Sequence, residues 1–434
     1  MSMADTYDFE AAKAAKSAKR LADKRKANGQ GAGGWQEALA FGDRGKPLAT
    51  LSNATIALAA APEFMGVFAW NDFAARVEVL CEIPDSVAGG IPRELRDVDI
   101  SATTLWLQRA AITVASKVTI EAIQVVATNN RFHPVRSYLA GLRWDQKARL
   151  DMWLVDHLGA EDTPLHRAFG SKWMISLVAR VMSPGCQADC ALIIESRQGL
   201  GKSTILRTLG GVWFTDHLPD LTNKDAMQQI QGVWIVELAE LDSLRRAETH
   251  RIKSFISARV DRFRPPFGRM PADFPRQCGF AGTVNPGANG YLRDETGARR
   301  FWTVACATEW ESRNRVDASS VAGVRDQLWA EALHRYRAGE CWHLDTQELE
   351  DAQAAAAEDR QEDDPRDRMV EAFLWGRKSV HMDEILGPDC LKIPVERWNR
   401  EIRTQIGYVM SALKWRRIRH RLEDGRREWR YVPP

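Results

Sequence analysis

The stretch from Gln198 to Thr204, Gln-Gly-Leu-Gly-Lys-Ser-Thr, combines residues suited to binding phosphate. Glycines let backbone N–H groups approach phosphates closely, a lysine reaches the β- and γ-phosphates, and the next hydroxyl is a ligand for Mg²⁺. The first glycine of the usual G-x-x-x-x-G-K-[ST] pattern is replaced by Ser196, which fits if its φ stays negative. We therefore expect an ATP site formed by Gln198, Gly199, Leu200, Gly201, Lys202, Ser203 and Thr204.

Two acidic residues end the apolar stretch 232–241, Gly-Val-Trp-Ile-Val-Glu-Leu-Ala-Glu-Leu. An ATPase needs such a strand beside its phosphate loop, because one carboxylate holds Mg²⁺ and another orients or deprotonates the attacking water. Glu237 and Glu240 fit these roles. We favour Glu237 for the metal, together with Ser203, and Glu240 for the base, with the reverse assignment left open.

Three residues further along the chain would complete the catalytic group. The short apolar run 280–284 ends at Asn285, whose amide would contact the γ-phosphate and the water. The paired arginines Arg299 and Arg300 suit charge on a transferring phosphoryl group, because a guanidinium is planar and always ionised. Either arginine could act within its own chain or in a neighbouring subunit's site. The alternative is a pair of surface salt bridges.

Two segments mix arginines with aromatic rings, a combination typical of proteins that bind single-stranded nucleic acid. In residues 253–270 the candidate DNA contacts are Lys253, Arg262, Arg264, Phe267 and Arg269. In residues 414–430 they are Arg416, Arg417 and Arg419. The alternative for the first segment is an ordinary loop. The alternative for the second is a solvated hairpin, or one that packs against another subunit.

The phosphate-binding residues require a strand before the turn and a helix after it. The apolar run 191–194 predicts a buried strand, and residues 204–209 predict the start of a helix. Upstream, residues 35–158 show mainly helical patterns, at 54–61, 105–113 and 119–127. His133 precedes Pro134, so it belongs in an extended segment and is expected to be structural rather than a metal ligand.

The C-terminal residues predict three helices and a hairpin. An acidic helix over 345–364 should run into a linker, followed by helices at 367–374, 380–386 and 401–413. Two strands around Asp424-Gly425 then form a basic hairpin, as in a winged helix-turn-helix. The expected organisation is a flexible basic tail (1–34), a helical domain (35–160), an α/β P-loop core (161–345), a linker (346–366) and a winged helix-turn-helix domain (367–434).

Composition narrows the class of protein. The 434 residues are 44% hydrophobic and 27% charged, values typical of soluble globular proteins of two or three domains. No apolar run is long enough to cross a membrane, and no secretory signal opens the chain. Seven scattered cysteines favour a reducing cytoplasm over a disulfide framework, and the pair Cys186 and Cys190 favours packing over zinc. The net charge of +2 is uninformative by itself.

Together these motifs resemble the virulence-associated E family of phage, prophage and plasmid proteins, whose core is similar to a superfamily 3 helicase of the AAA+ class. The resemblance covers roughly residues 50–345. It rests on Phe132-His-Pro-Val-Arg-Ser-Tyr-Leu139, Trp144-Asp-Gln-Lys-Ala-Arg-Leu150, Gln198-Gly-Leu-Gly-Lys-Ser203, Trp234-Ile-Val-Glu-Leu-Ala-Glu-Leu241, Gly282-Thr-Val-Asn285 and Arg293-Asp-Glu-Thr-Gly-Ala-Arg-Arg-Phe-Trp302.

The resemblance implies an ATP- and Mg²⁺-dependent motor that forms a ring, as a hexamer, on single-stranded or forked DNA in a bacterial host. It implies Walker A roles for Lys202 and Ser203, Walker B roles for Glu237 and Glu240, and a sensor role for Asn285. Arg299 or Arg300 would be the finger offered to a neighbour, residues 262–269 the DNA hairpin inside the ring, and translocation 3′ to 5′.

Two observations bear on the function that the resemblance implies. The primase–polymerase domain that relatives often carry upstream is not seen, so a separate primase is an expected partner. A nucleotide-gated DNA-binding initiator, or an interference factor without processive unwinding, would carry the same phosphate loop and winged domain. A small-molecule kinase fits less well, because no acceptor-pocket pattern accompanies the basic segments.

Overall fold

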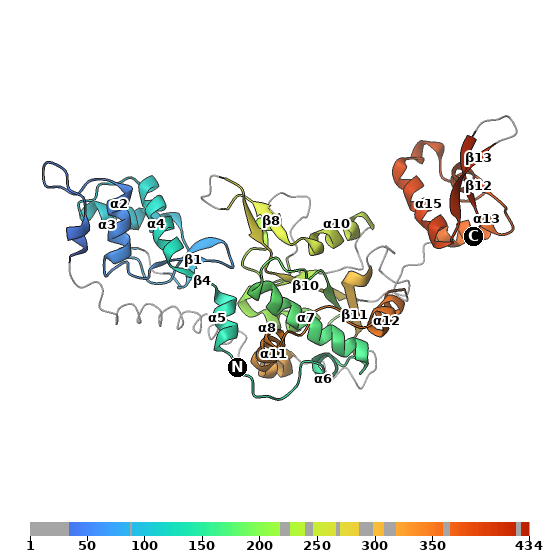
Figure 1. The fold of residues 1–434 in the computed structure, drawn as a ribbon, viewed down its shortest axis with the longest axis horizontal. Helices are drawn as coiled ribbons and strands as arrows, with labels where there is room; N and C mark the ends of the chain where they lie inside the picture. Colours follow the sequence, from blue (N-terminus) through green and yellow to red (C-terminus); the bar gives the residue numbers. More distant parts are fainter. Residues whose placement is uncertain are drawn as a thin grey trace. The chain divides into compact units, whose positions relative to one another are not determined.

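The computed structural model describes residues 34–86, 89–217, 226–238, 246–265, 270–285, 298–307, 318–358, 365–421 and 427–433. The chain divides into two compact units, residues 1–287 with 291–360 and residues 288–290 with 361–434, whose elements are labelled in Figure 1. Among the helices in these described ranges, none combines the length and the apolar character needed to span a bilayer.

The N-terminal part of the first unit combines helices with a small sheet. Its helices are η1 (Trp35–Ala38), α2 (Leu51–Ala60), α3 (Asp97–Arg109) and α4 (Ser116–Asn129), and its strands are β1 (Phe68–Asn71), β2 (Arg76–Val79), β3 (Arg93–Glu94) and β4 (Arg131–Phe132). The helical stretches predicted at 54–61 and 119–127 are confirmed, and the one at 105–113 is confirmed only as far as Arg109, where α3 ends. Helices make up most of the secondary structure of this part, in line with the prediction, but it also contains a four-stranded sheet of order β3-β2-β1-β4 that the sequence patterns did not indicate. Strands of two to four residues are too short to show a clear alternating pattern.

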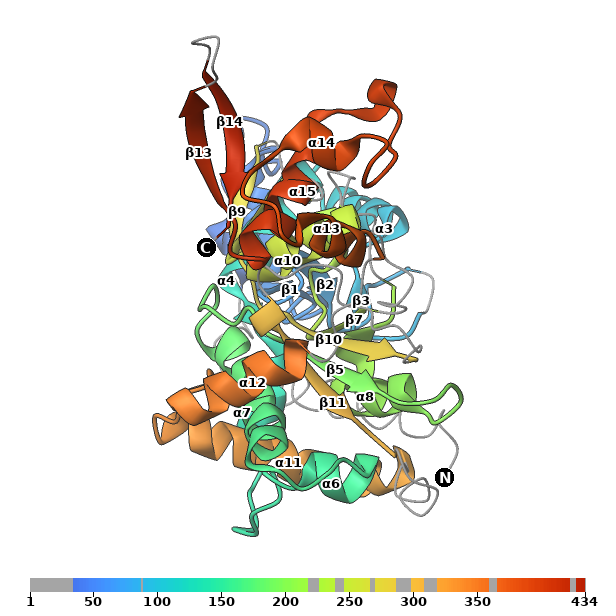
Figure 2. The ribbon, with the colours of Figure 1, turned by 90° about the vertical axis from the view of Figure 1, so that its right-hand side faces the viewer.

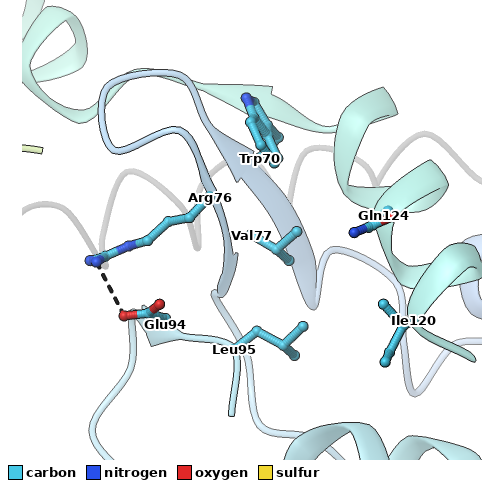
Figure 3. Close-up of a pocket in the computed structure, with 7 residues that line it drawn as sticks. All are labelled: Trp70, Arg76, Val77, Glu94, Leu95, Ile120 and Gln124. Atoms are coloured by element: carbon cyan, nitrogen blue, oxygen red, sulfur yellow. Dashed lines mark hydrogen bonds and ion pairs between the residues drawn. The ribbon is translucent and has the colours of Figure 1, made fainter. Parts of the chain in front are cut away.

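A small recess opens between this sheet and α4 (Figure 3). Its walls include Trp70, Val77 and Ile120, and an Arg76–Glu94 ion pair of 3.2 Å lies at its side. The volume is about 20 Å³, which is room for a water molecule rather than a ligand. The recess therefore carries no functional assignment.

A five-stranded parallel sheet forms the centre of the first unit, in the order β11-β5-β10-β7-β6. Its strands are β5 (Ala191–Glu195), β6 (Phe214–Thr215), β7 (Ile235–Leu238), β10 (Gly279–Val284) and β11 (Phe301–Ala305). All residues of β5 are buried, as expected for a strand covered on both faces. Because the strands are parallel, their carboxyl ends lie along one side of the sheet, which we call the carboxyl edge (Figure 2). Their amino ends lie along the opposite side, which we call the amino edge.

Alternate side chains of β5 enter two separate cores. Leu192 and Ile194 pack in the core that includes residues of α7 (Pro164–Met182), α8 (Lys202–Gly210) and α11 (Ala318–Arg337). Ala191 and Ile193 pack in the core that includes residues of α10 (Arg246–Ser257). The remaining helices of this unit are α5 (Pro134–Gly141), α6 (Trp153–Leu158), η2 (Gly211–Trp213), α9 (Ala226–Gln229), η4 (Ala298–Arg300) and α12 (Gln347–Glu358).

The turn between β1 and β2 anchors the N-terminal part to the central sheet. Phe73 is buried in the larger core, and its carbonyl accepts a hydrogen bond from Gly232 N at 3.1 Å. Gly232 has φ +79°, and a Cβ there would lie 3.0 Å from the Cβ of Ala74, so this position requires glycine on two grounds. The amide of Gln277 donates to the carbonyl of Asp72 at 3.0 Å. These contacts precede β7 and β10, at the amino edge of the sheet.

His133 lies at the same junction. Its backbone is extended, with φ −134° and ψ 105°, which confirms the prediction. Its Nδ1 accepts from the backbone N–H of Arg136 at 3.1 Å, so its Nε2 carries the proton and donates to Oε1 of Gln277 at 2.7 Å. Burial lowers the pKa of His133 to about 4. The imidazole is therefore neutral and structural.

A two-stranded hairpin of β8 (Val260–Phe263) and β9 (Ala272–Pro275) extends from the core. Asp261 and Arg276 form a buried ion pair at its base, at 0% and 1% side-chain exposure, and the Arg276 guanidinium also stacks 4.5 Å from the ring centroid of Phe255. The hairpin is thus fixed to the end of α10.

In its described residues, the second unit contains three α-helices, one short 3₁₀ helix and an antiparallel three-stranded sheet. They are α13 (Pro365–Leu374), β12 (Val380–His381), α14 (Met382–Leu386), η6 (Val395–Arg397), α15 (Arg400–Ala412), β13 (Arg416–Arg421) and β14 (Arg427–Val432), with sheet order β12-β14-β13. The predicted helices at 367–374 and 401–413 are confirmed. The predicted helix at 380–386 begins as a strand. The β13–β14 hairpin lies to one side of the helices of this unit (Figure 2).

Candidate nucleotide-binding site

The loop between β5 and α8 has the geometry that the sequence predicted. Gly199 and Gly201 adopt φ of +86° and +77°, which L side chains rarely adopt. A Cβ at either position would meet no atom within 4 Å. Glycine is therefore required by the backbone conformation and not by a lack of room for a side chain. Ser196 is not among the residues with positive φ, as its place in the pattern required. The strand–turn–helix prediction is confirmed by β5 and α8.

Lys202 begins α8 and is 8% exposed. Its Nζ donates to the carbonyl of Ser196 at 2.5 Å, to the carbonyl of Val284 at 3.0 Å, and to Oδ1 of Asn285 at 2.8 Å. The ammonium group therefore lies between the carboxyl ends of β5 and β10. Ligands of open α/β sheets bind outside this edge.

Glu237 lies beside Ser203, close to the start of α8. The Ser203 hydroxyl donates to Oε1 of Glu237 at 2.6 Å, and the Thr283 hydroxyl donates to the same oxygen at 2.7 Å. The other carboxylate oxygen, Oε2, is buried and has no hydrogen-bond partner in the part of the chain that the structure describes. An unsatisfied buried carboxylate oxygen is costly, and hydroxyl and carboxylate oxygens are the ligands that Mg²⁺ prefers. Ser203 and Glu237 therefore have the oxygen ligands that a magnesium ion requires.

Thr283 is a site residue that sequence reasoning missed. It lies on β10 two residues before Asn285, and alternate residues of a strand point to the same face. That period would have placed its hydroxyl on the same face as the Asn285 amide. Glu240, the predicted base, lies outside the described residues.

Arg299 and Arg300 lie at the opposite edge of the sheet from Lys202. They form η4 directly before β11, whose Phe301 pairs with Ala191 at the start of β5. The five residues of β5, about 16 Å of strand, separate them from the phosphate loop. An arginine side chain does not span this distance. The geometry contradicts a role for either arginine in the site of its own chain.

The two arginines differ in their surroundings. Nε of Arg300 donates to the Ser257 hydroxyl at 2.8 Å and lies 3.7 Å from Oδ2 of Asp189. Arg299 is exposed. Arg300 is therefore held within the subunit, whereas the Arg299 side chain faces solvent.

Of the DNA contacts predicted in residues 253–270, one is buried, two are exposed and two lie outside the described residues. Lys253 is 5% exposed, with Nζ 5.8 Å from the ring centroid of Phe301, so its burial contradicts a DNA contact. Arg262 and Arg264 are exposed on the β8–β9 hairpin, and the Arg262 guanidinium lies 3.6 Å from the Asp273 carboxylate. Phe267 and Arg269 lie outside the described residues.

The candidate contacts in the second unit lie on β13. Arg416, Arg417 and Arg419 are exposed. The Arg417 guanidinium lies 4.9 Å from the ring centroid of Trp429 on β14, so a cation and a ring face solvent together.

A separate open groove of about 510 Å³ lies between the start of α7, the end of β11 and α12. Many of its wall residues are apolar, with Leu165, Leu349 and Ala352 among them, and the walls also include Glu161 and Glu348. No residue of the phosphate loop lines it.

Comparison with known proteins gives a family. The model of the virulence-associated protein E-like domain matches residues 139–363. No curated protein matches the chain. An apo structure of the C-terminal region of NrS-1, residues 305–718, is 13% identical, with a TM-score of 0.35 over 68% of this chain and 77% of that chain. An A-form apo structure of the same region has a TM-score of 0.36 at 13% identity, over 68% and 78%. The family match spans more than half of the 434 residues, so the chain belongs to the virulence-associated protein E-like family.

Proposed function

We propose that this chain is an ATP-dependent DNA helicase of the superfamily 3-like AAA+ class, acting in the replication of a phage, prophage or plasmid element. The observation that carries the proposal is the meeting of Lys202, Ser203 and Glu237 at the carboxyl edge of a parallel sheet. The hydrogen bonds of Lys202 to Val284 and Asn285 join β10 to the same group.

The residues would divide the work as follows. Backbone N–H groups of residues 198–204, at the start of α8, bind phosphate oxygens, and Lys202 exchanges its carbonyl contacts for the β- and γ-phosphates. Ser203 and Glu237 hold the magnesium ion, which when bound neutralises charge on the phosphate oxygens. Asn285 orients the attacking water, and Glu240 is the proposed base.

The position of the arginines supports a ring. Because Arg299 and Arg300 lie at the amino edge, either one would reach a transferring phosphoryl group only in the site of a second copy of the chain. Arg299 is the proposed finger, since Arg300 is held by Ser257 and Asp189. A closed hexamer would repeat this contact at every subunit.

Two exposed basic surfaces support DNA as the substrate. The β8–β9 hairpin carries Arg262 and Arg264, and its connection contains Phe267 and Arg269. In the second unit, the order of helices and strands favours a winged helix-turn-helix whose basic hairpin contacts phosphates. A separate primase remains a proposed partner.

The test is a fork-unwinding assay run beside an ATPase assay. The proposal predicts ATP hydrolysis stimulated by single-stranded DNA, strand displacement, and loss of both with Lys202→Ala. ATP turnover with DNA binding but without strand displacement would favour the alternative, a nucleotide-gated initiator or interference factor. Absence of ATP hydrolysis with any DNA would overturn both. The mass of the protein with ATP analogue and DNA gives the subunit number.

A further inference from the structure

Trp375, in the second unit, has an unusual environment for a tryptophan. Its side chain is 90% exposed, more than any other large apolar residue in the described ranges. By contrast, five tryptophans are among the largest fully buried side chains, namely Trp153, Trp173, Trp234, Trp302 and Trp329. An exposed indole gives up the favourable burial of a large apolar surface. Its position therefore points to a ligand.

The backbone around Trp375 is firmly held. Residues 374–377 form a turn closed by a hydrogen bond from Arg377 N to the Leu374 carbonyl at 3.0 Å, and Gly376 takes φ +73° within it. Leu374 is 4% exposed on one side of the turn. On the other side, the Arg377 guanidinium lies 3.8 Å from the ring centroid of Phe373 and donates to its carbonyl at 2.9 Å. A fixed turn presents the indole at little cost in conformational entropy on binding.

The charge around this turn is basic. Arg377 and Lys378 follow Trp375 and are exposed. Strand register brings further cations to the same end of the sheet, because Val380 of β12 pairs with Tyr431, and Arg416 of β13 pairs with Val432 on the other side of β14. The residues before β12 and before β13 thus share one end of the sheet, where Lys414 is also exposed. Glu371, one turn earlier on α13, is an exposed acid on this side.

We propose that Trp375 stacks on an unpaired base of single-stranded DNA, while Arg377 and Lys378 contact the flanking phosphates. Rings that stack on bases and cations that follow the backbone together bind single strands without sequence preference. A duplex offers no exposed base face to an indole, so this site distinguishes single-stranded from double-stranded DNA. The site lies at the end of the sheet away from the β13–β14 connection. It goes beyond the proposed motor, because it requires neither ATP nor the phosphate loop.

The test measures DNA affinity of the full chain without nucleotide, by fluorescence anisotropy. The probes are a labelled oligothymidine and an abasic oligonucleotide of the same length, which keeps the phosphates but offers no base to stack. Trp375→Ala should weaken oligothymidine binding by about 5- to 150-fold, the range for loss of one base–aromatic stack. It should leave abasic binding unchanged, and Trp375→Phe should retain part of the affinity.

Two controls separate the stacking site from the motor and from exposed rings elsewhere in the chain. Phe41→Ala removes a ring that is 50% exposed in the N-terminal part of the chain, and should leave both affinities unchanged. Lys202→Ala should abolish ATP hydrolysis but keep the difference in affinity between oligothymidine and the abasic oligonucleotide. A failure of the proposed motor can therefore be distinguished from a failure of the proposed stacking site. The proposal is overturned if Trp375→Ala binds oligothymidine like the wild type. It is also overturned if the variant changes only the oligomeric mass, because Trp375 would then contact protein.

Discussion

The two edges of the central parallel sheet hold polar groups of different kinds. At the carboxyl edge, Glu237 keeps one buried oxygen without a hydrogen-bond partner in the described ranges. At the amino edge, Asp261 and Arg276 form a complete buried pair, and Arg300 bonds to Ser257. The amino edge also contains unsatisfied groups, since Nε and Nη1 of the buried Arg180 have no hydrogen-bond partner in the described ranges, while its Nη2 donates to the carbonyl of Ala188 before β5. What distinguishes the carboxyl edge is the kind of group, a carboxylate oxygen beside a hydroxyl, which suits a cation. Strand direction therefore separates the phosphate loop from Arg299 and Arg300 within one chain, so the proposed finger would have to come from a second copy.

The largest expected effect concerns the carboxyl edge. Glu237→Gln should lower the rate of ATP hydrolysis by about 100-fold or more, because a catalytic metal contributes several kcal/mol to the barrier and the variant removes its charged ligand. The rate is measured over a magnesium titration. Thr283→Val is the matched control, since it deletes one hydrogen bond to the same carboxylate and keeps the charge. It should cost about 10-fold or less. Equal effects of the two variants would contradict a metal role for Glu237.

At the amino edge, the expected effect is on stability. Asp261→Asn leaves the Arg276 guanidinium buried without a counter-charge, and should lower the free energy of unfolding by about 3–5 kcal/mol in urea denaturation. Asp273→Asn is the control on the same hairpin, because its pair with Arg262 is 59% and 72% exposed and is worth about 1 kcal/mol or less. If both variants cost the same, the buried pair does not anchor the hairpin.

The smallest effect concerns the junction at His133. Well above pH 6.5 the imidazole is neutral in both the folded and the unfolded states. As the pH falls from 6.5 to about 4, His133 becomes protonated in the unfolded chain but stays neutral in the folded chain. The free energy of unfolding therefore falls by up to about 3 kcal/mol. His133→Asn keeps an N-cap acceptor for Arg136 N and does not titrate. Urea denaturation at pH 7 and pH 4.5 should show a smaller pH dependence in this variant. An unchanged pH dependence would assign the effect to other groups.

Local patterns were predictable, and pairings between distant segments were not. Gly199, Gly201 and Lys202 identified the loop because positive φ and phosphate chemistry restrict residue type within a few positions. The location of Arg299 depends on β11 pairing in register with β5, a contact across more than a hundred residues that no local pattern encodes. The short strands of the N-terminal sheet were missed for a related reason, since two to four residues carry little periodicity.

The burial of individual side chains was also not predictable from the sequence. Lys253 belongs to a basic segment, yet its helix turns the ammonium toward Phe301 and away from solvent. Trp375 shows the reverse, because this large aromatic side chain follows the buried Leu374 in the chain and yet lies outside the core, at the turn that contains Gly376. Composition gives the residue types in a segment, but the direction of each side chain comes from packing.

The central claim is that each ATP site is formed between two copies of the chain, with Lys202 from one and Arg299 from the other. The direct measurement is the ATPase rate of Lys202→Ala and Arg299→Ala proteins, alone and mixed under conditions where subunits exchange. Each variant alone should be inactive. The mixture should recover up to about a quarter of the wild-type rate, the share of contacts that pair two intact halves by chance in a ring. No recovery in proven mixed oligomers, or full activity of Arg299→Ala alone, would contradict the account.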